Sequence, residues 1–147
     1  MMIPSGMGEE LQRQREMCID PYTRVANRSK ELVPMEVKTV LTLEKSGKGL
    51  HVATTICNQA KDHRVRVVMP TGLNTSTHLA DSAFEVVKRN NRHNDTWTNP
   101  CGCERQQCFA AMEDETNGLL VANRGLYEYE VLADEENAIA VRCFAPL

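Results

Sequence analysis

Residues Gly118 to Val131 read Gly-Leu-Leu-Val-Ala-Asn-Arg-Gly-Leu-Tyr-Glu-Tyr-Glu-Val, and this stretch decides the fold. Two short apolar runs flank a tight Asn-Arg-Gly turn. The second run alternates apolar and acidic residues from Tyr127 onward, which is the period of a half-buried strand. Gly125 reaches positive φ at low cost, so the chain can reverse there. The stretch therefore predicts two strands joined by a corner with Arg124 at its tip.

The side chain at this corner is suited to binding. A guanidinium is planar and permanently charged, and its fork of donors matches carboxylates and hydroxyls. An exposed loop arginine without any ligand has the same local sequence, however. The residues alone leave both interpretations of Arg124 open.

The alternating pattern recurs along the chain after residue 32. It predicts further strands near 33–43, 50–56, 65–69, 84–87, 108–112 and 138–144. The odd-numbered residues of 33–43 and the even-numbered residues of 50–56 are expected to face inward, with a glycine-rich hairpin turn at 46–49 between the two strands. Residues 71–81 and 88–100 are interpreted as loops.

Seven or eight short strands with hairpin spacing, and no amphipathic helix after residue 32, predict an all-β fold. The expected architecture is an antiparallel β-sandwich of the supersandwich kind. Residues 1–32 are expected to form a polar lead-in, partly helical or disordered. Residues 33–147 are expected to form a single β-sandwich domain, which is long enough to bury a core.

The composition excludes several classes of partner. A net charge of -3 and a pI near 5.8 give no basic field for nucleic acid. No run approaches the ~18 apolar residues that span a bilayer, and the N-terminus does not resemble a signal peptide. We therefore expect no nucleic-acid partner, no membrane partner and a cytoplasmic location.

The residues offer no complete catalytic or metal site. No serine or cysteine has a base at a suggestive spacing, and the four scattered histidines, His51, His63, His78 and His93, are interpreted as surface residues. Glu128 and Glu130 lie about 7 Å apart on one strand face, within the range of paired glycosidase carboxylates, but adjacent outward glutamates usually form the wet side of a sheet. A metal site around Cys101, Cys103 and Cys108 stays an alternative with an incomplete ligand set.

Two segments resemble the C-terminal β region of glycoside hydrolase family 38, the retaining α-mannosidases. One is Asn58 to Leu73, which reads Asn-Gln-Ala-Lys-Asp-His-Arg-Val-Arg-Val-Val-Met-Pro-Thr-Gly-Leu, and the other is Gly118 to Val131. Their order and separation, and the closing Ile139-Ala140-Val141, are also similar to that family. The resemblance covers roughly residues 33 to 147.

The resemblance implies a part of a larger enzyme. In that family a separate α/β domain carries the aspartate nucleophile, the acid/base aspartate and a zinc ion, and none of those motifs is present here. No catalytic residue and no metal ligand is therefore expected in this chain, and zinc is expected only in the missing catalytic domain. One arginine of the β region approaches the active site in an Asn-Arg-Gly-Leu turn, which matches Asn123-Arg124-Gly125-Leu126. The resemblance therefore implies that Arg124 faces the substrate, with Asn123 as a second candidate.

The implied function is to wall the active-site cleft of an α-mannosidase and to support double displacement by the catalytic domain of the same parent chain. Mannosylglycerate is an equally compatible substrate. The alternative is a free-standing carbohydrate-binding or assembly β-sandwich without catalysis. Because an isolated piece would expose its docking face, association into a homo-oligomer is also an open expectation.

Overall fold

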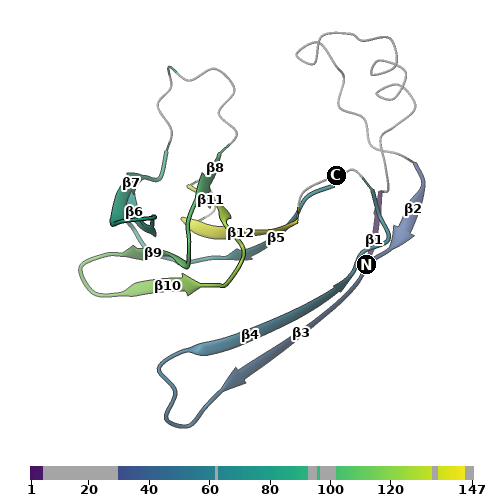
Figure 1. The fold of residues 1–147 in the computed structure, drawn as a ribbon, viewed down its shortest axis with the longest axis horizontal. Helices are drawn as coiled ribbons and strands as arrows, with labels where there is room; N and C mark the ends of the chain where they lie inside the picture. Colours follow the sequence, from purple (N-terminus) through teal and green to yellow (C-terminus); the bar gives the residue numbers. More distant parts are fainter. Residues whose placement is uncertain (5–29, 62, 93–95, 97–101, 134–135, 145–147) are drawn as a thin grey trace. The chain divides into compact units, whose positions relative to one another are not determined.

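A computed structural model describes residues 1–4, 30–61, 63–92, 96, 102–133 and 136–144. Over these residues the chain forms twelve β-strands and no helix (Figure 1). The strands are β1 (Met2–Pro4), β2 (Leu32–Pro34), β3 (Glu36–Leu43), β4 (Leu50–Cys57), β5 (Val65–Met69), β6 (Thr77–Asp81), β7 (Val86–Asn90), β8 (Cys103–Arg105), β9 (Phe109–Glu113), β10 (Gly118–Ala122), β11 (Glu128–Leu132) and β12 (Ala138–Phe144). The prediction of an all-β fold is confirmed.

The chain divides into two compact units, one of residues 1–63 with 146–147 and one of residues 64–145. In the first unit, β1 pairs antiparallel with β2, and β3 pairs with β4 over the full length of both strands. The predicted strand 33–43 is in fact two strands, because Met35 between them is buried and donates its backbone N–H to the Met1 carbonyl at 2.8 Å. The start of the lead-in is thus a strand, and residues 5–29 of it lie outside the described part of the chain.

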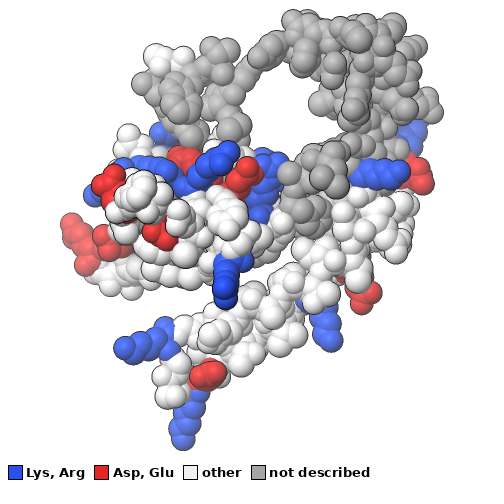
Figure 2. Space-filling model, in the orientation of Figure 1, with Lys and Arg blue, Asp and Glu red and all other residues white. Residues whose placement is uncertain are grey.

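The β3–β4 hairpin has an apolar face, as the alternation predicts. Its cross-strand pairs include Val37 with Ile56 and Leu41 with Val52. Every residue of β3 is nevertheless exposed, and Leu41 is 61% exposed. The expectation that this face points inward is therefore wrong for the described residues of the first unit, which provide no second layer to cover it. Figure 2 shows that the hairpin is mainly uncharged along its length.

The second unit is a sandwich of two four-stranded antiparallel sheets, with strand orders β10-β9-β6-β7 and β5-β12-β11-β8. Both sheets contribute to a single hydrophobic cluster, so their inner faces pack against each other. Its buried members are Leu73, Ala80, Ala110, Met112, Val121, Tyr129, Ile139 and Val141. The predicted sandwich is therefore present in this unit.

The hairpin between β9 and β10 is closed by a carboxylate. Asp114 Oδ1 accepts hydrogen bonds from the backbone N–H groups of Thr116 and Asn117, both at 2.8 Å. These hydrogen bonds lower the pKa of Asp114, because they stabilise its ionised form. An aspartate that bonds to the backbone two residues on is a common turn former, so this connection follows from local sequence.

Besides β1, two strands occur where no strand was predicted. β6 lies within residues 71–81, which were interpreted as a loop, yet it is a central strand of its sheet. β8 lies at the edge of the other sheet. The predicted loop at 88–100 also begins too early, because β7 continues to Asn90. The inward residues of β6 are His78 and Ala80, and a polar and a small side chain give no apolar alternation to detect.

Candidate functional site

The turn between β10 and β11 has the positive φ at glycine that its sequence predicts, but it is not the hairpin-like corner expected, because the two strands belong to different sheets. Gly125 adopts φ = 85°, and an added Cβ there would meet no atom within 4 Å. The backbone N–H of Asn123 donates to the Cys108 carbonyl at 2.8 Å. The backbone N–H of Leu126 donates to Asn123 Oδ1 at 3.2 Å. The reversal is therefore held at both ends, with Arg124 and Gly125 between the two anchors.

Arg124 is exposed at this turn. Its guanidinium makes no hydrogen bond or ion pair with the other residues that the structure describes. Tyr127, three residues on, is also exposed, by 62% of its surface. A cation and an aromatic ring thus lie on one short segment, and the guanidinium is available to a ligand from outside this chain.

Asn123, the second candidate for substrate binding, shapes the turn with its side chain. Its Oδ1 accepts from Leu126, while its Nδ2 is buried and has no partner among the described residues. The amide is thus directed toward the protein in this structure, and contact between Asn123 and a substrate stays a prediction.

A residue that the sequence analysis did not single out lies behind the same turn. Gln106 is 2% exposed, and its Nε2 donates to the Leu126 carbonyl at 3.1 Å. Its backbone N–H donates to the Tyr127 carbonyl at 3.0 Å. No pattern in the sequence marks Gln106, because its partners are some twenty residues away along the chain and are backbone carbonyls.

The two glutamates of β11 are neutralised by arginines of the same sheet. Glu128 is ion-paired with Arg142, and Glu130 with Arg66. Arg64 Nη2 also lies 3.6 Å from Glu130 Oε2. Figure 2 shows the same intermixing of basic and acidic side chains on the second unit. This pairing fits the interpretation of the two glutamates as the wet side of a sheet.

A buried polar network links the two sheets of the sandwich. His78 Nε2 of β6 lies 2.7 Å from Tyr129 Oη of β11, and His78 Nδ1 lies 3.0 Å from Asn91 Oδ1. Tyr129 Oη is also 3.0 Å from Glu104 Oε2 and 2.9 Å from Arg89 Nη1. The prediction that His78 is a surface residue is wrong, because its side chain is 1% exposed. The same prediction is wrong for His63, which is buried at 9% exposed, and is confirmed for His51, which is exposed. His93 lies outside the described residues.

The network perturbs the ionisation of its members. Burial raises the pKa of Glu104, but hydrogen bonds from His78 and Tyr129 outweigh burial and lower the pKa overall. Burial raises the pKa of the Tyr129 hydroxyl well above its ordinary value. Burial lowers the pKa of Arg89, but its bonds with Tyr129 and Glu104 raise it overall. Glu104 and Arg89 are thus held charged, and Tyr129 neutral, at physiological pH.

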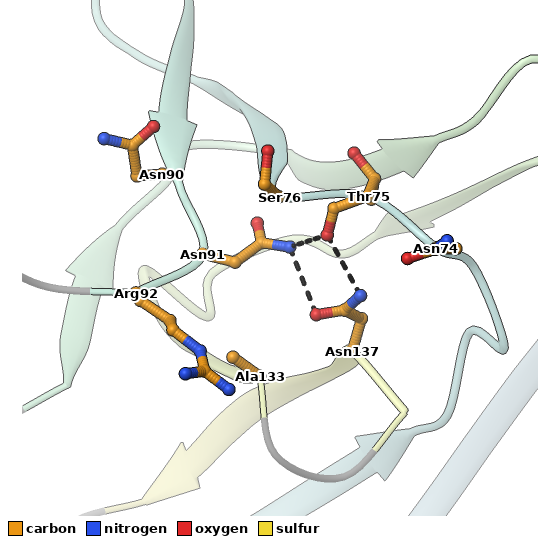
Figure 3. A pocket seen from close by; sticks show the side chains of 8 residues that line it. All are labelled: Asn74, Thr75, Ser76, Asn90, Asn91, Arg92, Ala133 and Asn137. Atoms are coloured by element: carbon orange, nitrogen blue, oxygen red, sulfur yellow. Dashed lines mark hydrogen bonds between the residues drawn. The ribbon is translucent and has the colours of Figure 1, made fainter.

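A polar pocket of about 480 Å³ adjoins this network (Figure 3). It is lined by Asn74, Thr75, Ser76, Asn90, Asn91, Arg92, Ala133 and Asn137. Its two inner amides bond to each other and to the chain, since Asn91 Nδ2 donates to Asn137 Oδ1 at 3.2 Å and to the Thr75 carbonyl at 2.8 Å. Asn137 Nδ2 donates to the carbonyls of Leu73 and Thr75. These amides hold neighbouring segments of the chain together and have little hydrogen-bonding capacity left for a ligand.

The described residues do not fit a metal ion. No group of three or more His, Cys, Asp or Glu side chains within them could hold one. Of the proposed cysteine cluster, Cys101 lies outside the described part, and Cys103 Sγ accepts a hydrogen bond from Arg64 Nη1 at 3.3 Å. A membrane-spanning helix is likewise not found in the part of the chain that the structure describes.

Three comparisons with known proteins give a consistent result. Residues 12–142 match the family model described as "Glycosyl hydrolases family 38 C-terminal domain". A relative named "Putative mannosylglycerate hydrolase", from Halalkalibacterium halodurans, is 37% identical over 134 residues, which cover 91% of this chain and 15% of that protein.

Two solved structures are also similar. The crystal structure of an α-mannosidase from Enterococcus faecalis V583 has a TM-score of 0.91 and 42% identity, and covers 99% of this chain and 16% of its own. A second structure, of a family 38 glycosyl hydrolase protein from Enterococcus faecalis, has a TM-score of 0.87 and 40% identity, with the same coverage. The chain therefore spans only about one sixth of the length of these relatives. With a family model matched over most of its length, the chain belongs to glycosyl hydrolase family 38 and corresponds to the C-terminal domain of that family.

Proposed function

We propose that this domain walls the active-site cleft of a family 38 enzyme that hydrolyses α-mannosidic bonds, and that Arg124 contacts the substrate. The observation that carries the proposal is the Arg124 turn. An exposed guanidinium with no partner among the described residues lies on a backbone that is held at both ends. Charge-assisted hydrogen bonds to sugar hydroxyls, or to the carboxylate of a mannosylglycerate, suit such a group.

The chemistry of bond cleavage is assigned to a catalytic domain outside these 147 residues. Double displacement needs two carboxyl groups with different protonation states. The carboxylate pair considered in the sequence analysis, Glu128 and Glu130, is neutralised by arginines. In the proposal, a zinc ion held by that catalytic domain would orient sugar hydroxyls. A cytoplasmic location and self-association are further parts of the proposal.

A chimera tests the proposal. Residues 1–147 would replace the matched segment of the Enterococcus faecalis α-mannosidase, since the two superpose over 99% of this chain. We expect the chimera to hydrolyse 4-nitrophenyl α-mannoside and the isolated chain to show no turnover. Turnover by the pure isolated chain would contradict the assignment of catalysis to another domain. Two results together would favour a free-standing binding module. The chimera would fold but be inactive, and the isolated chain would bind mannose oligosaccharides tightly in calorimetry.

A further inference from the structure

A buried glutamine lies directly behind the turn that carries Arg124. Gln106 stands between β8 and β9, and its side chain crosses to the β10–β11 connection. Its Nε2 donates to the Leu126 carbonyl at 3.1 Å, and its backbone N–H donates to the Tyr127 carbonyl at 3.0 Å. Two successive carbonyls after Arg124 are therefore bonded to a single residue of a neighbouring loop.

The same peptide is held from its other side. The Leu126 backbone N–H donates to Asn123 Oδ1, and the Leu126 side chain packs against the hydrophobic core. Asn123 is itself tied to the Cys108 carbonyl. Only Arg124 and Gly125 lie between these fixed points, so the backbone that carries the guanidinium has few conformations left.

The arrangement leaves two buried polar atoms without partners. Gln106 Oε1 and Asn123 Nδ2 are both inaccessible and unbonded among the described residues. Burial of a polar atom without a partner is unfavourable, and an apolar side chain of the same length would avoid it at position 106. The amide of Gln106 is explained by the bond that it does make, which is the bond to Leu126.

We propose that Gln106 is a positioning residue for Arg124. Its carboxamide couples the β8–β9 connection to the Arg124 turn, so that the guanidinium meets the substrate without first having to be ordered. This inference rests on the proposed substrate-facing role of Arg124. It adds a second residue, which touches no ligand and acts only through the backbone of Leu126.

Hydrogen exchange on the 147-residue chain tests the structural half. Gln106→Met keeps the length and burial of the side chain but removes its donor. We expect backbone amides of the Arg124 turn, including Leu126, to exchange about tenfold faster, because local opening costs less, while amides of β12 keep their rates. Gln107→Met is the matched control, because Gln107 is the adjacent glutamine and its side chain is exposed. Equal exchange at the turn in both variants would overturn the inference. If Gln106→Met does not fold, Gln106→Leu takes its place.

A double-mutant cycle in the chimera tests the functional half. We expect Gln106→Met to lower kcat/KM about three- to tenfold when Arg124 is present and to have no further effect in an Arg124→Ala background, since coupled residues are not additive. The same loss in both backgrounds would overturn the positioning role and leave the proposed function standing. An Arg124→Ala chimera with unchanged kcat/KM would instead contradict the proposed function itself, together with this use of Gln106.

Discussion

At the scale of single residues, the turn after β10 combines a backbone requirement with an exposed charge. Gly125 adopts a left-handed φ of 85° with open space around it. Arg124, the residue before it, is exposed and makes no hydrogen bond or ion pair with the described residues, so its side chain contributes little to folding. The glycine therefore serves the shape of the turn, while the proposed role of the arginine is in binding, which allows each residue to be tested separately.

Substitution of Gly125 by alanine should destabilise the chain by about 1–2 kcal/mol, because an L-residue pays this cost in a left-handed conformation. The added methyl group itself meets nothing within 4 Å, so no steric clash contributes. The free energy of unfolding from urea titration measures the change.

Gly49→Ala is the matched control for this variant. Gly49 also has open space around it but lacks a positive φ, so its substitution should change stability by less than about 0.5 kcal/mol. Equal losses at the two glycines would show that the conformation of Gly125 is not what matters.

At the scale of elements, the two sheets of the sandwich are joined by a polar contact as well as by the apolar core. The Tyr129 hydroxyl lies at its centre, within bonding distance of His78, Arg89 and Glu104. Tyr129→Phe keeps the ring and leaves these partners incompletely bonded, so we expect a loss of about 1–3 kcal/mol in the free energy of unfolding.

Tyr127→Phe provides the control for the hydroxyl. It removes the same atom from a ring that is 62% exposed, and its effect should stay within about 0.5 kcal/mol. Calorimetric melting of both variants distinguishes them, and a Tyr129→Phe variant as stable as Tyr127→Phe would show that the network adds nothing to the sandwich.

The same network makes stability depend on pH. The pKa of Glu104 is lower in the folded chain than its ordinary value of 4.5. The folded state therefore stabilises the ionised carboxylate of Glu104 relative to the unfolded state. That contribution is present at neutral pH and is lost as the pH falls through the ordinary value toward the lowered one. The advantage of the wild type over Glu104→Gln should therefore be about 1–3 kcal/mol near neutrality and shrink on acidification.

Paired urea titrations of the wild type and Glu104→Gln at about pH 7 and about pH 4 measure this change. The difference between the two proteins removes the effect of other acids, such as Asp114, whose pKa is also lowered. A stability difference that is the same at both pH values would contradict the role of the Glu104 charge.

The sequence predicted those elements whose buried residues are apolar or whose turns need glycine or aspartate. The β10–β11 turn and the closing strand β12 are of this kind, while the β3–β4 pairing was predicted from alternation alone although β3 is exposed. It could not predict β6, because its inward residues are His78 and Ala80, and the burial of His78 is compensated by hydrogen bonds with Asn91 and Tyr129, 13 and 51 residues along the chain. Gln106 was missed at the candidate site for the same reason. Long-range hydrogen bonds determine the burial of both His78 and Gln106, and the local hydrophobic periodicity does not reveal such bonds.

At the scale of the whole molecule, the chain corresponds to one domain of much longer relatives. Its relatives are about six times as long, and the first unit exposes apolar side chains such as Leu43, at 73%, on its hairpin. A two-stranded hairpin is only marginally stable in water without a layer to pack on.

We expect the isolated chain to associate with itself at high concentration, and Leu41→Lys to reduce this association. Light scattering measures it, with Thr42→Lys, on the opposite strand face, as the control. Equal association of both would contradict the apolar face as its cause.

The most direct test of the central claim is the kcat/KM of the chimera for 4-nitrophenyl α-mannoside with Arg124→Ala, compared with Lys88→Ala, which removes an exposed cation from β7. A charged hydrogen bond to the substrate is worth about 1.5–3 kcal/mol, or roughly 10- to 100-fold in rate. The account predicts a loss of that size for Arg124→Ala, with unchanged thermal stability, and no loss for Lys88→Ala. Equal kcat/KM for the two variants would contradict it.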